Sequence, residues 1–118
     1  MVGHGPHDVL PVEVYRGRAI LYGLGSFSFH TGHGGRAHGN WIGMMARAQV
    51  AAGAISDVRF RFVRHNARNE TVPCRLADES AELDDVAARS AAYGTSLGRD
   101  GEEVVVALTE GTGARPAP

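Results

Sequence analysis

The chain has 118 residues, a formal net charge of −1 and twelve positive side chains, all of them arginine. This length predicts one domain, or part of a larger one, with its own hydrophobic core. With a net charge near zero and arginines scattered along the chain, the sequence predicts neither a basic surface for nucleic acid nor an acidic tail. The single cysteine excludes an intrachain disulfide, and no apolar run approaches the roughly 18 residues of a membrane span or the pattern of a signal peptide.

The first motif is Gly3-His4-Gly5-Pro6-His7, in which two imidazoles lie three residues apart. Gly and Pro at the other positions favour a loop over a helix, and imidazole is the commonest protein ligand for catalytic transition metals. His4 and His7 are therefore candidate metal ligands. The spacing alone favours an ordinary surface pair, and two histidines without further ligands predict a labile site.

Residues 9–25, directly after this motif, are predicted to form a β-hairpin. Val12 and Val14 alternate with Glu13 and Tyr15, which is the period of a half-buried strand. The next two residues, 16 and 17, are Arg-Gly and supply a two-residue turn in which glycine provides a positive φ.

Residues 30–40 are rich in glycine and histidine and have no apolar period, which predicts a loop. His30, His33 and His38 form a second candidate metal site. The glycines make this loop entropically costly to order, and no carboxylate lies within it. A surface loop is therefore the favoured interpretation.

Residues 41–50 and 54–63 predict a second hairpin. On the first strand Met44, Ala46, Ala48 and Val50 share one face, and on the second Val58, Phe60 and Phe62 share another. Arg59, Arg61 and Arg64 are expected on the opposite face. His65, at the end of the second strand, is expected to be solvated.

One helix is predicted, over residues 78–93. Asp78 or Ser80 can cap its first N–H groups, and Gly94 suits the left-handed conformation of a helix stop. Its buried stripe is expected to consist of Leu83, Val86, Ala87, Ser90 and Ala91. A turn at 98–101 and a short strand within 103–108 follow, and residues 109–118 are expected to be a disordered tail.

No arrangement of residues supports nucleophilic or paired-carboxylate catalysis. The pairs Asp78-Glu79 and Asp84-Asp85 fall on the polar face of the helix, where a solvated face is the ordinary interpretation. Cys74 follows a proline without a persuasive histidine partner and is interpreted as a small apolar filler.

Two segments carry a resemblance to a known family. The run GHGPHDVLPVEVYRGRAILYGLGSFSF, residues 3–29, resembles the signature segment of the CapA family, the poly-γ-glutamate capsule-synthesis proteins with the fold of calcineurin-like metallophosphoesterases. The run CRLADESAELDDVAARSAAYGTSL, residues 74–97, is similar to the late segment of that family. Ser26 departs from the asparagine usual in the family, which puts the role of that position in question.

The resemblance implies metal-assisted hydrolysis at a two-metal site, to which the loop with His4 and His7 is the last contribution. A divalent ion (Mn, Zn or Fe) is expected for the intact family member, and weak or no metal binding and hydrolase activity for these 118 residues, because the other ligands of the family lie upstream. Residues 1–108 are expected to be the C-terminal portion of such a domain, in a fragment or a product of a late start codon.

The fold implied is a β-rich α+β fragment of a metallophosphoesterase-like α/β/β/α sandwich, with two antiparallel hairpins and one C-terminal helix. Open strand edges favour a homodimer, and the intact protein is expected to partner other capsule-synthesis proteins. We expect a soluble chain, cytoplasmic or, in an intact form, membrane-associated. Two alternatives stay open: a non-catalytic β-rich remnant or interaction module, and, less favoured, a histidine-rich metal-sequestering protein.

Overall fold

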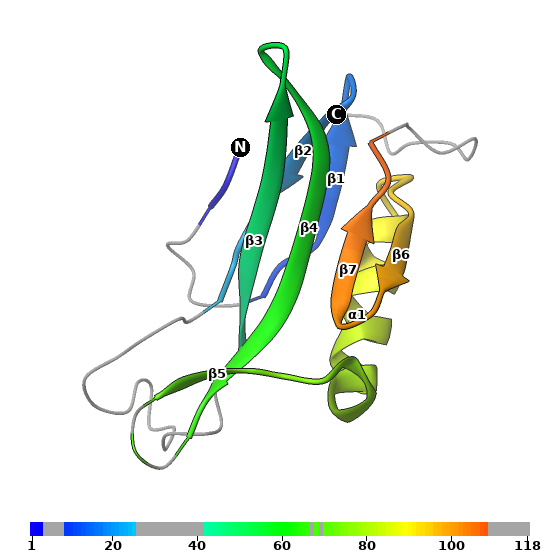
Figure 1. The fold of residues 1–118 in the computed structure, drawn as a ribbon. Coiled ribbons are helices and arrows are strands. Elements are labelled where there is room, and N and C mark those ends of the chain that lie inside the picture. The colour runs from blue at the N-terminus through cyan, green and yellow to red at the C-terminus, as the bar shows by residue number, and fades with distance from the viewer. Residues whose placement is uncertain (4–8, 26–41, 67, 69, 109–118) are drawn as a thin grey trace.

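The computed structural model describes residues 1–3, 9–25, 42–66, 68 and 70–108 (Figure 1). Its elements are β1 (Val12–Tyr15), β2 (Arg18–Leu21), β3 (Ile42–Ala51), β4 (Ala54–His65), β5 (Thr71–Pro73), the 3₁₀ helix η1 (Leu76–Glu79), α1 (Ser80–Ala91), β6 (Leu97–Asp100) and β7 (Glu103–Val106). The predicted β-rich α+β fold with two early hairpins and a helix after them is confirmed. The histidines at 4, 7, 30, 33 and 38, Ser26, Trp41 and the 109–118 tail lie outside the described residues.

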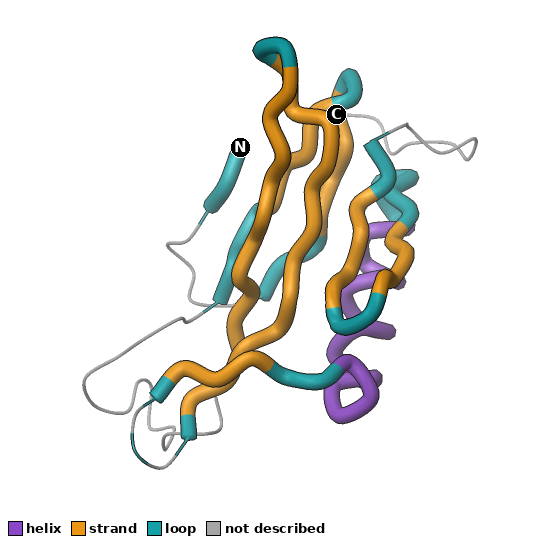
Figure 2. The backbone as a smooth tube through the Cα atoms, in the orientation of Figure 1, coloured by secondary structure: helices purple, strands orange, loops and turns teal. Residues whose placement is uncertain are grey.

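The strands form two antiparallel sheets (Figure 2). β1 and β2 form a two-stranded sheet, and the larger sheet has the order β3-β4-β7-β6, with β5 also pairing with β4. The β1–β2 turn has positive φ at both central residues, 52° at Arg16 and 74° at Gly17, which matches the twist of a two-residue hairpin. The β3–β4 turn repeats this pattern at Ala52 and Gly53.

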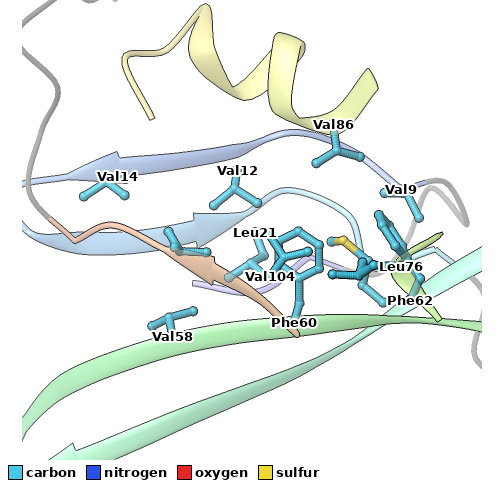
Figure 3. Close-up of a cluster of buried hydrophobic side chains, with 12 residues drawn as sticks. Val9, Val12, Val14, Leu21, Val58, Phe60, Phe62, Leu76, Val86 and Val104 are labelled. Atoms are coloured by element: carbon cyan, nitrogen blue, oxygen red, sulfur yellow. The ribbon is translucent and has the colours of Figure 1, made fainter. Parts of the chain in front are cut away.

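The hydrophobic core lies between the two sheets and extends to α1 (Figure 3). Val12 and Val14 of β1, Phe60 and Phe62 of β4 and Val86 of α1 are each at most 2% exposed. A single core therefore joins the small sheet, the large sheet and the helix.

A serine hydroxyl of α1 accepts a hydrogen bond from the edge of β1 that does not pair with β2. Ser90, which is fully buried, accepts a hydrogen bond from the backbone N–H of Val12 at 2.9 Å. This bond satisfies an edge donor that would otherwise be buried without a partner. Helix α1 is thereby fixed to β1 by a polar contact as well as by Val86.

The helix ends as predicted and begins differently. Gly94 has a φ of 76°, and the N–H groups of Gly94 and Thr95 donate to the carbonyls of Ala91 and Ser90, which is the Schellman arrangement of a helix stop. The residue before α1 is Glu79, the last residue of η1, and its side chain does not cap the helix. The side chain of Asp78 pairs with Arg75. The predicted cap is therefore wrong.

The predicted turn at 98–101 is also wrong. Residues 97–100 form β6, which pairs with β7 from Leu97↔Val106 to Asp100↔Glu103. The turn lies one step later, at Gly101 and Glu102, and Gly101 has a φ of 61°. Strand β5, which no sequence pattern predicted, pairs with the end of β4.

Three polar side chains lie in other surroundings than expected. Arg64 falls on the same face of β4 as Phe60 and Phe62, because side chains of alternate residues share a face, and its guanidinium meets Glu79 of η1. Glu79 is therefore buried, at 9% exposure. His65 is 2% exposed and not solvated, because it lies opposite Thr71 of β5 and within the paired sheet.

None of the described helices is long and apolar enough to cross a membrane.

Candidate functional site

The structure fixes both ends of the segment that carries His4 and His7. On the N-terminal side, the Gly3 N–H donates to the Leu21 carbonyl at 2.7 Å, and the Leu24 N–H donates to the Gly3 carbonyl at 3.1 Å. Val2 also forms a parallel bridge with Leu21. The residues before the segment thus run alongside the end of β2 and its continuation.

On the C-terminal side, the chain returns to the residues that follow β2, on their other edge. Val9 forms an antiparallel bridge with Leu24, and the Leu10 N–H donates to the Gly23 carbonyl at 3.1 Å. Since one strand separates the two anchors, Gly3 and Val9 lie about 10 Å apart, twice the spacing of neighbouring strands. The histidine segment therefore starts and ends at the Gly23–Gly25 end of the small sheet.

Two glycines at this junction allow the backbones to approach closely. A Cβ on Gly3 would overlap the carbonyl oxygen of Tyr22, and one on Gly25 would lie 2.6 Å from that of Ile42. Gly25 also has a φ of 73°, which disfavours other residues. Its antiparallel bridge to Gly43 joins this end of the small sheet to β3.

A buried carboxylate lies on the strand that follows the segment. Glu13 of β1 is 7% exposed and accepts a hydrogen bond of 2.5 Å from the Tyr22 hydroxyl. The Tyr22 ring lies 6.1 Å from the ring of Tyr93. Alternation with Val12 and Val14 gave no indication that Glu13 is buried. A carboxylate and two tyrosine side chains thus lie together on the small sheet and the end of the helix.

The helix contributes a second polar contact beside Val9. The Arg89 guanidinium donates to the Val9 carbonyl at 3.5 Å and pairs with Asp85 at 3.4 Å. Asp84 and Asp85 are exposed, as the solvated-face interpretation predicted. The second predicted acidic pair differs, because Glu79 pairs with Arg64 at 2.7 Å and this partner raises the pKa of Arg64.

Cys74 behaves as the apolar filler that the sequence predicted. Its side chain packs against the core cluster, and burial, with a smaller contribution from the Glu79 carboxylate, raises the pKa of the thiol to about 11. A thiol with so high a pKa is protonated at neutral pH and is a poor nucleophile or metal ligand.

The described residues do not form a metal site by themselves. Among them, no group of three or more His, Cys, Asp or Glu side chains is placed to hold an ion. A metal site in this protein would therefore need side chains outside the described residues, such as those of His4 and His7 or of His30, His33 and His38.

No protein-family model matches the chain. A segment of 32 residues is 53% identical to the PGA biosynthesis protein CapA of Bacillus subtilis (strain 168), and it covers 27% of this chain and 8% of that protein.

The likeness is short relative to both proteins. The chain matches less than a tenth of the length of the Bacillus subtilis protein. A match of 32 residues is too short to include both resembling segments, 3–29 and 74–97. It therefore supports a CapA-like relationship over part of the chain.

Proposed function

We propose that this chain acts in the biosynthesis of a capsular polymer, poly-γ-glutamate, as a CapA-like protein with a metallophosphoesterase-like fold. The observation that carries the proposal is the segment 53% identical to CapA. The anchoring of both ends of the histidine segment supports it, because a ligand loop needs a rigid base to hold its imidazoles in place.

Within this proposal, His4 and His7 hold a divalent ion (Mn, Zn or Fe), and further ligands come from outside the described residues. When bound, such an ion supplies Lewis-acid stabilisation of a phosphoryl oxygen. The contribution of this chain's own residues is positional. Gly3 and Val9 fix the two ends of the segment on opposite edges of the stretch at residues 21–24, and the close packing at Gly25 keeps that end of the sheet against β3.

The metal part of the proposal is tested by calorimetric titration of Mn²⁺ and Zn²⁺ into the 118-residue chain. We expect weak binding, because two imidazoles leave the remaining coordination positions to water. We expect that binding to vanish in the double variant His4→Ala/His7→Ala.

The matched control is His30→Ala/His33→Ala, which removes two histidines of the same spacing from the glycine-rich segment. It is expected to bind as the unchanged chain does. Loss of binding in the control alone would instead support the histidine-rich sequestering protein. Absence of binding in the unchanged chain would contradict the metal site and favour the non-catalytic module.

The biosynthetic part is tested in the Bacillus subtilis protein itself. The 32 residues of CapA that match this chain are exchanged for the chain's own residues, and capsular polymer is quantified. We expect polymer production to be retained, whereas a scrambled segment of the same composition is expected to abolish it. Loss of polymer with both exchanges, despite normal protein levels, would argue against functional equivalence.

A further inference from the structure

Strand β3 is paired along only part of one edge. β4 pairs with β3 over its whole length. On the other edge, the described contacts are confined to the beginning of the strand, where the Met44 N–H donates to the Leu24 carbonyl at 2.6 Å and Gly43 bridges Gly25. Beyond Met44 this edge extends toward the β3–β4 turn. Figure 1 shows the β3–β4 hairpin reaching beyond the ends of β6 and β7.

The direction of the Met44 N–H identifies which backbone groups lie along that edge. In a regular strand the N–H and C=O of one residue point to the same side, and the side alternates from residue to residue. Ala46 and Ala48 therefore point their backbone groups away from β4, as Met44 does. Val50 continues this alternation, because the register shift between Gln49 and Val50 leaves its extra residue, Ser56, on β4. Among the described residues, no backbone hydrogen bond from another segment reaches these three.

The same part of β3 borders a groove with a volume of about 600 Å³. Its apolar lining residues include Val2, Leu21, Ala46, Ala48, Ile55 and Val58, and Arg16, Arg18 and Arg47 also line it. Val50 and Ile55 are 67% and 56% exposed. Apolar side chains gathered beside unpaired backbone groups are typical of an interaction surface.

We propose that this edge binds a second copy of the same chain, with the two β3 strands antiparallel about a two-fold axis at Ala48. The proposal does not depend on the proposed function. When two identical edge strands pair antiparallel, the outward N–H and C=O groups of one copy face the C=O and N–H groups of the other. The same surface therefore forms the interface in both subunits. The result is one continuous sheet across the two copies.

The register follows from what already occupies the edge and from charge. An axis at Ala46 would require pairing at Met44, where Leu24 is bound. An axis at Arg47 would place two arginines directly opposite each other, which is destabilising. An axis nearer the turn leaves fewer residues to pair.

An axis at Ala48 avoids these conflicts. It sets Ala48 opposite itself and Ala46 opposite Val50, so the outward groups of three residues on each copy form six backbone hydrogen bonds. The exposed Val50 of each copy then lies beside Ala46 of the other, at the groove. Arg47 comes opposite Gln49, and its charge is already paired with Glu103 at 2.6 Å.

The test combines a mass measurement with cross-linking of the full chain. Size-exclusion chromatography with light scattering is expected to give twice the chain mass of 12.5 kDa. In a Cys74→Ser background, Ala48→Cys is expected to form an intermolecular disulfide under mild oxidation, because hydrogen-bonded antiparallel pairs have Cα atoms about 5.5 Å apart.

Ala46→Cys in the same background is the matched control. In the proposed register its two copies are four residues apart along the strands, at least about 13 Å, so no disulfide is expected. Equal cross-linking of both variants would overturn the register, and with it the ordered interface. A monomeric mass at every concentration would overturn the proposal and assign the edge to a different polypeptide.

A substitution at the axis provides an independent check. Ala48→Pro removes an N–H that does not bond to β4, and proline is tolerated at such edge positions. We expect a monomer with an unchanged circular dichroism spectrum. A folded variant that keeps the doubled mass would contradict pairing through β3.

Discussion

At the scale of single residues, Gly25 joins the small sheet to β3 at the end that carries the histidine segment. Both its positive φ and its close approach to the Ile42 backbone disfavour any residue with a Cβ at this position. Gly53, in the β3–β4 turn, has a similar φ of 77° but nothing within 4 Å of the position a Cβ would take. The two glycines therefore separate the cost of the backbone conformation from the cost of crowding.

We expect Gly53→Ala to lower the free energy of unfolding by about 1 kcal/mol, the cost of a left-handed conformation in a residue with a Cβ. Gly25→Ala is expected to cost about 2 kcal/mol more, because the added Cβ also meets backbone atoms that cannot rotate away. Urea titrations of both variants measure the difference. Equal losses of free energy in the two variants would show that Ile42 and Gly43 move away from residue 25 without cost.

The residue scale also shows where sequence patterns failed. Arg64 was expected, with Arg59 and Arg61, on the face opposite the apolar side chains, but its even position puts it on the face of Phe60 and Phe62. Strict alternation along β4 predicts that face. The pairing with Glu79 depends on how η1 lies against the end of the sheet, which no local pattern in the sequence contains.

At the scale of elements, local signals predicted most of the fold. The Arg-Gly turn and the alternating valines predict the first hairpin, and the helix and its glycine stop follow from residue spacing. β5 and β6 were missed because they are short and exposed. Their pairing with β4 and β7 comes from tertiary contacts that override weak local preference.

The candidate site was predictable only in part. The sequence identified the histidine motif and the hairpin after it, and the structure added the anchors at Gly3 and Val9. The parallel bridge that holds Val2 against Leu21 joins residues far apart along the chain. Such a pairing has no periodic signature, so the position of the motif on the fold was not accessible from the sequence.

At the scale of the whole molecule, the described part of the chain forms one core shared by both sheets and the helix. Val86 of α1 belongs to the same buried cluster as Val12 of β1 and Phe60 of β4. Because no element has a separate core, we expect the described part to unfold in a single cooperative transition. The contact that tests this is the bond between the buried Ser90 hydroxyl and β1.

We expect Ser90→Ala to lower the free energy of unfolding by about 1–3 kcal/mol, because the Val12 N–H then stays buried without an acceptor. The same loss should be seen in the helical signal at 222 nm and in tyrosine absorbance, since Tyr22 and Tyr93 report on the small sheet and on the end of the helix. The control is Ser96→Ala at an exposed serine, with an expected change below about 0.5 kcal/mol. Different midpoints for the two signals would mean that the helix and the small sheet unfold separately and would contradict the shared core.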